Sequence, residues 1–123
     1  MAATILKQGR VLIASIQAAL SDRELIELRD AFAERVGRFR SRGVIIDVTA
    51  LDVLDSFATR TLRDIAYTAR LRGATAVVVG IQPDVAFAMV QLGLSLEGVL
   101  TALDLEEGLA RLGEVGKDAH RVR

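Results

Sequence analysis

The chain has 123 residues, a formal net charge of zero at pH 7, one histidine and no cysteine. This length suits a single domain built around one hydrophobic core. The lack of cysteine excludes disulfides, a thiolate nucleophile and cysteine-based metal sites, and it favours a cytoplasmic protein over a small secreted one. The zero net charge argues against phosphate-backbone binding, so we expect no nucleic-acid partner.

Apolar residues make up 51% of the chain, and its mean hydropathy is +0.35. No apolar run approaches the roughly 18 residues needed to span a bilayer. The first ten residues do not combine a charged leader, a long apolar segment and a cleavage site, so we expect neither a secretory signal nor a membrane partner. We attribute the high apolar content to strands buried on both faces and to a subunit interface.

Two short apolar runs open the chain, at residues 5–7 and 10–17, and Gly9 lies in the break between them. The second run is rich in β-branched residues that partly alternate. A break containing glycine between two such runs is typical of a tight turn. The pattern predicts a β-hairpin that begins a sheet.

The next segment predicts an amphipathic helix that ends before Gly43. Ser21 and Glu24 have the spacing of a capping box. Apolar residues then recur every three or four positions. The predicted apolar stripe consists of Leu25, Leu28, Phe32, Val36 and Phe39.

Two β-branched runs, at residues 43–48 and 75–80, predict parallel strands that are buried on both faces. The segment between them predicts a crossover helix that stops at Gly73. Its apolar stripe is expected to consist of Ala58, Leu62, Ile65, Ala66 and Ala69. The residues expected to point away from that stripe are Thr59, Arg60, Arg63, Asp64, Tyr67 and Arg70.

The C-terminal third predicts a short helix, an edge strand and a last helix. Pro83 is suited to the first turn of a helix that Gly93 ends, and residues 96–103 suit a short edge strand. Asp104 and Glu107 have the spacing of a cap before the last helix. The expected buried stripe of the first of these helices is Val85, Ala86, Met89 and Leu92, and that of the second is Leu105, Leu109 and Leu112.

Alternating strands and helices predict an α/β fold. We expect a mixed, mostly parallel β-sheet of four to five strands, with an N-terminal hairpin and about four helices. We assign residues 1–112 to one domain and 113–123 to a polar C-terminal tail. Leu94, Leu96 and Val99 are expected either to pack under the last helix or to form a subunit contact.

Catalytic motifs are missing from the sequence. The glycines form no phosphate-binding loop, and His120, the only imidazole, falls in the polar tail, which leaves no Ser-His-Asp triad. Asp52 and Asp55 flank a strand-to-helix turn, where we favour turn and recognition roles over hydrolysis. We therefore predict no catalytic residue, no metal and no cofactor. A small enzyme or ligand-binding domain that uses these two carboxylates in a turn-side pocket is the alternative of another class.

Ser56 falls at the start of the crossover helix, where two roles are open. Its hydroxyl suits the helix cap, which contributes on the order of 1 kcal/mol. It is also placed to accept a phosphate, which adds about −1.5 to −2 charge beside Asp52 and Asp55. The partial positive charge of the helix N-terminus stabilises such a phosphate, and the added charge repels an acidic partner surface. The arginines that follow form either a solvated face or a contact for a partner's acidic patch: Arg60, Arg63, Arg70 and Arg72.

Four segments, at residues 44–48, 51–60, 79–86 and 93–103, together resemble the STAS domain family of anti-sigma-factor antagonists. The resemblance covers residues 5 to 112 and implies the STAS fold. By this resemblance Ser56 matches the family's regulatory phosphoserine. Sporulation-type members usually continue the Asp-Ser motif with a small residue and Gly-Leu. This chain has Phe-Ala-Thr-Arg there instead, which favours the RsbS-type, stressosome branch.

The resemblance implies a non-enzymatic scaffold that forms homo- or hetero-oligomers with RsbR-type STAS sensor proteins in a large cytoplasmic complex. In this role the chain sequesters a serine/threonine switch kinase of the RsbT type until Ser56 is phosphorylated. The residues expected to border the kinase are Asp52, Asp55, Phe57, Thr59 and Arg60. The alternative is a small independent anti-anti-sigma factor that binds an anti-sigma kinase and is regulated at the same serine. Further phosphoacceptors are left open at Thr49, Thr59 and Thr61.

Overall fold

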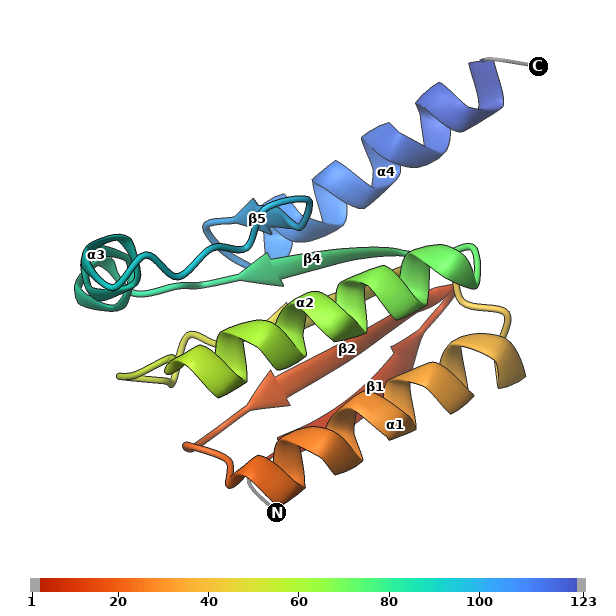
Figure 1. Ribbon diagram of the computed structural model, residues 1–123. Coiled ribbons are helices and arrows are strands. Elements are labelled where there is room, and N and C mark those ends of the chain that lie inside the picture. The colour runs from red at the N-terminus through yellow and green to blue at the C-terminus, as the bar shows by residue number, and fades with distance from the viewer. Residues whose placement is uncertain (1–2, 122–123) are drawn as a thin grey trace.

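The computed structural model describes the backbone of residues 3–121 and the side chains of residues 3–113. One mixed sheet has helices on both faces (Figure 1). The strands are β1 (Ala3–Gln8), β2 (Val11–Ile16), β3 (Gly43–Asp47), β4 (Thr75–Val79) and β5 (Leu100–Ala102). The helices are α1 (Asp22–Arg38), α2 (Ser56–Leu71), α3 (Pro83–Gln91) and α4 (Leu105–Arg121).

The sheet has five strands in the order β1-β2-β3-β4-β5. β1 pairs antiparallel with β2, with Leu6 opposite Ile13, and the other neighbouring pairs are parallel. Gly9 has a φ of +61° in the turn between β1 and β2, a conformation that glycine adopts without steric strain. The predicted fold class, with its opening hairpin and parallel crossovers, is confirmed.

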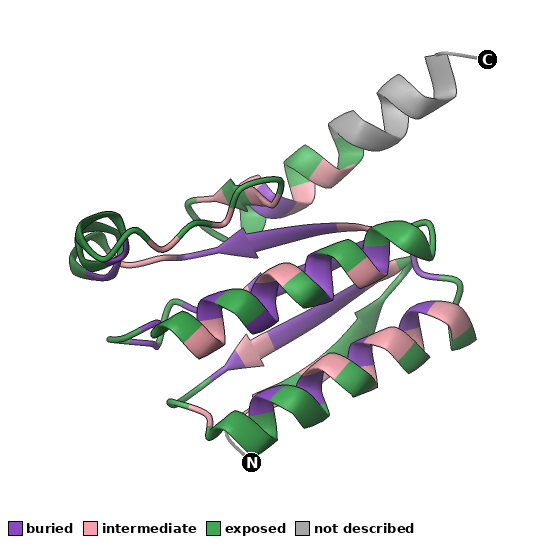
Figure 2. Cartoon of the chain, in the orientation of Figure 1, coloured by how far each residue is buried: buried purple, intermediate pink, exposed green. Residues whose placement is uncertain are grey.

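Two hydrophobic clusters hold the layers together. On one face, α1 and α2 pack over the sheet, and residues such as Phe32, Leu62 and Ile46 are almost fully buried (Figure 2). On the other face, α4 lies across β3, β4 and β5, where Ile45 and Val77 are 0% exposed. Burying each of these side chains contributes about 1.5–3 kcal/mol. The prediction that β3 and β4 are buried on both faces is therefore confirmed.

Four apolar residues assigned to buried stripes are exposed instead. One of them is Leu105, which is 36% exposed at the first position of α4. Phe39 follows the last residue of α1 and is 37% exposed, with the charged groups of Lys7 and Arg38 within 6 Å of its ring centre. Ala86 and Leu92 are exposed because the short helix α3 buries only one narrow side against the core. The helix lies beyond the carboxyl end of β4 rather than flat on the sheet (Figure 1), so its outer side packs against no other element of the described domain.

The segment between α3 and β5 packs against the α1–α2 side of the sheet. Leu94, Leu96 and Val99 are half-buried against that cluster, so the expectation that they lie under the last helix is wrong. Two side chains of α2 bind this segment. Tyr67 donates a hydrogen bond to the Glu97 carbonyl at 2.9 Å, and Arg70 donates one to the Gly98 carbonyl at 2.5 Å.

The last helix begins as predicted, because the Asp104 carboxylate accepts a hydrogen bond from the Glu107 amide at 2.9 Å. α4 extends to Arg121 and so includes most of the range 113–123 assigned to a tail. The side chain of His120 lies outside the described residues, and the division at residue 112 stays a prediction. Within residues 3–121, no helix combines the length and apolarity that crossing a membrane requires.

Candidate functional site

The candidate site is the segment that links β3 to α2 at the carboxyl end of the parallel strands. The segment follows Asp47, the last residue of β3. The carboxylate of Asp47 accepts hydrogen bonds from the amide and the hydroxyl of Thr49, at 2.9 and 2.6 Å. Leu51 and Leu54 then anchor the segment in the core, with 7% and 5% of their surface exposed. The residues between these anchors therefore lie on the surface in a defined conformation.

Asp55 and Ser56 occupy consecutive positions where α2 begins. Asp55 is the N-cap, and its carboxylate accepts a hydrogen bond from the Ala58 amide at 2.8 Å. Ser56 is the first residue of the helix and is exposed. The cap role that we considered for Ser56 therefore belongs to Asp55, because the N-cap residue must lie outside the helix with an extended backbone. The Ser56 hydroxyl is not needed for the cap.

The electrostatics of this helix start suit an added anion on Ser56. The first turn of α2 contains no acidic residue, so the partial positive charge of the helix N-terminus is offset only by the carboxylate of the preceding Asp55. Asp52 is also exposed on the same segment. A phosphate on Ser56 therefore adds negative charge to a surface that already carries two carboxylates.

The residues expected to border the kinase do not all reach the surface. Asp52, Asp55 and Arg60 are exposed and Phe57 is half-buried, whereas Thr59 is 2% exposed. Thr59 is therefore removed from the contact set. The reason is that α2 packs against both α1 and the sheet, so its buried stripe is wider than the spacing of its large apolar residues indicated.

The candidate second phosphoacceptors differ in exposure. Thr59 and Thr61 are both buried, and the Thr61 hydroxyl donates a hydrogen bond to the Phe57 carbonyl at 2.9 Å. Within the described part of the chain, the Thr59 hydroxyl has no hydrogen-bond partner. Thr49 is exposed near the start of the same segment. Of these three threonines, only Thr49 is exposed in the folded domain, and its hydroxyl is bonded to Asp47.

Several exposed apolar residues at this edge were not predicted from the sequence. Val53, between the two buried leucines, is 68% exposed, and Phe87 and Val90 on α3 are 70% and 78% exposed. The side chain of Gln82, the N-cap of α3, donates a hydrogen bond to the Thr49 carbonyl at 2.6 Å, which links the two loops at this edge. The sequence signal was the apolar composition of α3 on every side of the helix, of which the structure buries only Val85 and Met89.

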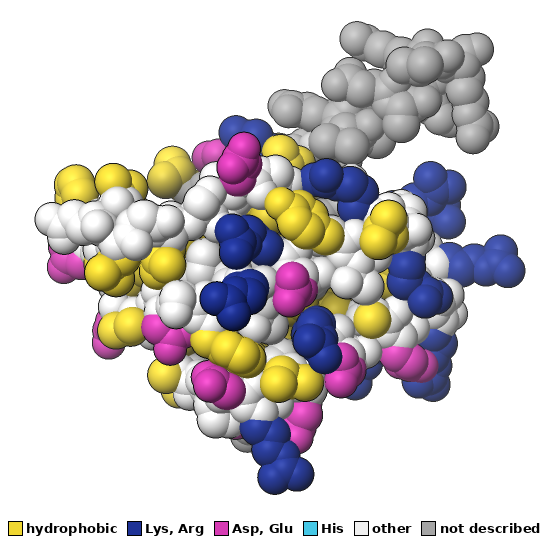
Figure 3. Space-filling model, viewed as in Figure 1, with side chains coloured by type: hydrophobic (Ala, Val, Ile, Leu, Met, Phe, Trp, Pro, Cys, Tyr) yellow, Lys and Arg dark blue, Asp and Glu magenta, His cyan; other side chains and the backbone are white. Residues whose placement is uncertain are grey.

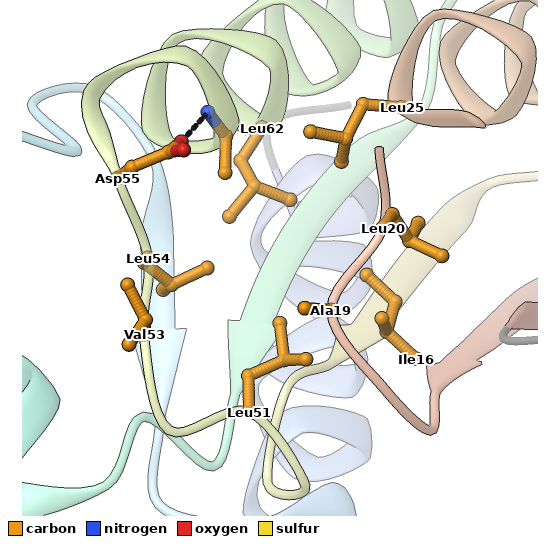
Figure 4. A pocket seen from close by; sticks show the side chains of 10 residues that line it. Ile16, Ala19, Leu20, Leu25, Leu51, Val53, Leu54, Asp55 and Leu62 are labelled. Carbon is orange, nitrogen blue, oxygen red and sulfur yellow. Dashed lines mark hydrogen bonds between the residues drawn. The ribbon is translucent and has the colours of Figure 1, made fainter. Parts of the chain in front are cut away.

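A small apolar hollow of about 90 Å³ lies beside the site, between the loop before α1 and the segment before α2 (Figure 4). Its lining includes Leu20, Leu25, Leu54 and Asp55 but not Asp52. The Asp55 carboxylate is directed at the helix start, where it caps α2. The structure therefore does not place the two carboxylates together in a turn-side pocket. Among the described residues, no three His, Cys, Asp or Glu side chains are grouped as a metal site requires.

The surface around α1 and α2 carries charges of both signs. Figure 3 shows basic and acidic side chains interspersed over the middle of this face, whereas basic side chains predominate toward its right edge, where α1 and α2 end. Arg60 is exposed one helical turn after Ser56, and Arg70 binds a backbone carbonyl of the segment before β5. Near the start of α2 the exposed charges are of both signs, with Asp52 and Asp55 beside Arg60, so a single phosphate changes the local potential substantially.

Comparison with known proteins shows the family of the chain. Residues 2–108 match the family model described as the STAS domain. An RsbS from Moorella thermoacetica, solved as a serine-to-glutamate variant, is 33% identical, with a TM-score of 0.80 over 94% of this chain and 97% of that one. A chain solved in the molecular architecture of the stressosome is also 33% identical, with a TM-score of 0.72 over 92% of this chain and 98% of that one.

Two further relatives extend the comparison. The RsbT co-antagonist protein RsbRA of Bacillus subtilis is 34% identical over 74 residues, which cover 60% of this chain and 27% of RsbRA. This chain thus matches only about a quarter of that longer protein. The anti-sigma factor antagonist SpoIIAA has a TM-score of 0.69 over 89% of this chain and 96% of that one, but at 11% identity it supports the fold alone. The chain belongs to the STAS domain family and is similar, over nearly its whole length, to the RsbS-type proteins of the stressosome.

Proposed function

We propose that this chain is a non-enzymatic switch and scaffold subunit of a bacterial stress-response pathway. In its unphosphorylated form it holds a serine/threonine switch kinase of the RsbT type, and phosphorylation of Ser56 releases that kinase. One observation carries the proposal: Ser56 is exposed at the first position of α2, while Asp55 alone caps the helix. The hydroxyl can therefore be modified without breaking a contact that the fold uses.

The surface that we assign to the kinase surrounds this serine. Asp52, Asp55 and Arg60 are exposed beside it, and Phe57 supplies a half-buried ring. A phosphate on Ser56 adds charge next to the two carboxylates, so it repels any acidic group that a partner brings to the same place. Because Leu51 and Leu54 anchor the segment, this repulsion acts on a fixed surface and needs no unfolding.

We further propose that the chain assembles with RsbR-type STAS proteins in a cytoplasmic stressosome. The similarity to an RsbS, to a chain of a stressosome and to the RsbT co-antagonist RsbRA supports this assignment. An independent anti-anti-sigma factor would use the same serine but stay small. Sedimentation of the chain mixed with an RsbR-type protein distinguishes the two, because only the scaffold role gives a large assembly.

The direct test of the modification site is to incubate the chain with its cognate kinase and ATP and to locate the phosphate by mass spectrometry. We expect one phosphate on Ser56 and none on the Ser56→Ala variant. Thr49→Ala is the matched control, because Thr49 is the other exposed hydroxyl of the same segment, and its phosphorylation should equal that of the wild type. Phosphate at another position, with Ser56→Ala modified as fully as the wild type, would refute the assignment.

A further inference from the structure

A groove of about 430 Å³ runs between the edge strand β1 and helix α1, at the opposite edge of the sheet from β5 (Figure 1). Its apolar lining includes Ile5, Leu28 and Ala31, and its charged lining consists of Glu24, Glu27 and Arg35. The outer edge of β1 pairs with no strand of the described domain. Such an edge, beside an open apolar groove, is a surface on which another chain can pack.

The three charged residues of α1 that line this groove belong to a longer stripe, which Arg38 extends beyond the lining. At about 100° per residue, four charged residues fall within about 40° of Ala31. They are Glu24, Glu27, Arg35 and Arg38. The two acidic residues precede Ala31 and the two basic residues follow it. Glu24, Glu27 and Arg38 are exposed, while Ala31 and Arg35 are half-buried.

The spacing of this stripe is symmetric about Ala31. Glu27 and Arg35 lie four residues to either side of it, and Glu24 and Arg38 lie seven residues to either side. A second copy of α1, packed antiparallel on a two-fold axis at Ala31, therefore places Glu27 against the Arg35 of that copy. The same axis places Glu24 against the Arg38 of the second copy. The small side chain at the axis allows the two helices to approach closely.

Interactions within one chain explain only part of this pattern. The capping box with Ser21 engages Glu24, and Arg38 lies 3.8 Å from Glu34. Arg35 is accounted for by the helix dipole, which favours basic residues in the last turn. It does not account for Glu27, which lies beyond the first turn, or for the apolar groove beside the stripe. Glu27 is 3.5 Å from Arg23, but both side chains are largely exposed, so this pair is weak and leaves Glu27 able to bind another arginine.

We infer that the groove between β1 and α1 is the contact surface for a second copy of this chain, packed antiparallel across a two-fold axis at Ala31. The apolar groove supplies the buried area, and the mirrored charges set the orientation. The inference rests on the proposed scaffold role, and it names a surface through which copies of this chain associate. It involves neither Ser56 nor the kinase.

Variants that exchange the charges of Glu27 and Arg35 test this interface. Sedimentation velocity of the isolated chain, over a range of concentrations, measures their self-association. Glu27→Arg and Arg35→Glu should each raise the dissociation constant for self-association by at least about tenfold, because each places like charges together twice in the dimer. The double variant Glu27→Arg/Arg35→Glu should restore association. An equimolar mixture of the two single variants should also associate, as mixed dimers that native mass spectrometry can identify.

Arg63→Glu is the matched control, because it makes the same charge change on α2, away from the groove, and should associate as the wild type does. A wild-type chain that stays monomeric throughout overturns the inference. So do single variants that associate normally, or a mixture that does not recover association. None of these results depends on the kinase, so a failure of kinase binding would count against the proposed function and leave this inference unaffected.

Discussion

At the scale of single residues, Asp55 and Ser56 divide two tasks where α2 begins. Asp55 supplies the helix cap through its 2.8 Å hydrogen bond with the Ala58 amide, and this leaves the exposed Ser56 hydroxyl available for modification. A serine that itself capped the helix would couple phosphorylation to the stability of α2. In the proposed function, this separation of the two tasks lets a phosphate on Ser56 act on partner binding alone.

We therefore expect Asp55→Ala to lower the free energy of unfolding by about 1 kcal/mol, because the Ala58 amide loses its side-chain acceptor. Asp55→Asn should keep most of the stability, since asparagine also caps helices. Asp52→Ala should leave it unchanged. Urea denaturation measures all three. Equal stability of Asp55→Ala and Asp55→Asn would show that the cap contributes nothing.

The buried Thr59 provides a second test at this scale. Its hydroxyl has no hydrogen-bond partner among the described residues, so Thr59→Val should leave the free energy of unfolding unchanged or raise it by up to about 1 kcal/mol. Thr61→Val is the matched control and should be the less stable of the two, because the Thr61 hydroxyl binds the Phe57 carbonyl. A folded Thr59→Val variant that no longer binds the kinase would return Thr59 to the contact set.

At the scale of elements, the approach of α4 to the sheet depends on glycine. A Cβ on Gly108 would lie 2.7 Å from Cγ1 of Val79, a side chain that is itself 0% exposed. Because neither Val79 nor the backbone of α4 has free space, a larger residue must push the helix away from the sheet. The close contact between α4 and β4 is thus built into this position.

Gly108→Val should lower the free energy of unfolding by about 1–3 kcal/mol, since it overpacks the contact between α4 and β4. Gly113→Val is the matched control in the same helix, because a Cβ there meets no atom of the described residues within 4 Å. It should change stability by less than about 0.5 kcal/mol. Thermal or urea unfolding of the two variants makes the comparison, and equal losses would contradict the packing described for Gly108.

The sequence predicts where the helices and strands lie better than it predicts which elements pack against one another. The Ser21 capping box, the strands buried on both faces and the helix start at Ser56 were all predicted correctly, because each depends on a local pattern. Thr59 was placed wrongly because its burial depends on α1 packing beside α2, which no local pattern shows. The β1–α1 groove was not foreseen for the same reason, since its two sides meet only in the folded sheet.

At the scale of the whole molecule, the apolar content and the zero net charge have separate consequences. Two clusters, one on each face of the sheet, account for much of the 51% apolar content, and the open groove beside β1 adds apolar surface suited to assembly. The balanced charge leaves the domain without a strong overall field. A phosphate on Ser56 then acts as a large local change at one edge of the molecule.

The central claim is that the phosphorylation state of Ser56 controls kinase binding. The most direct test measures the affinity of the cognate kinase for four proteins: the unphosphorylated chain, the phosphorylated chain, Ser56→Ala and Ser56→Asp. We expect the unphosphorylated chain and Ser56→Ala to bind alike. We expect phosphorylation to weaken binding by at least about tenfold, and Ser56→Asp to weaken it to a smaller extent. Equal affinity for the phosphorylated and unphosphorylated chains would contradict the account.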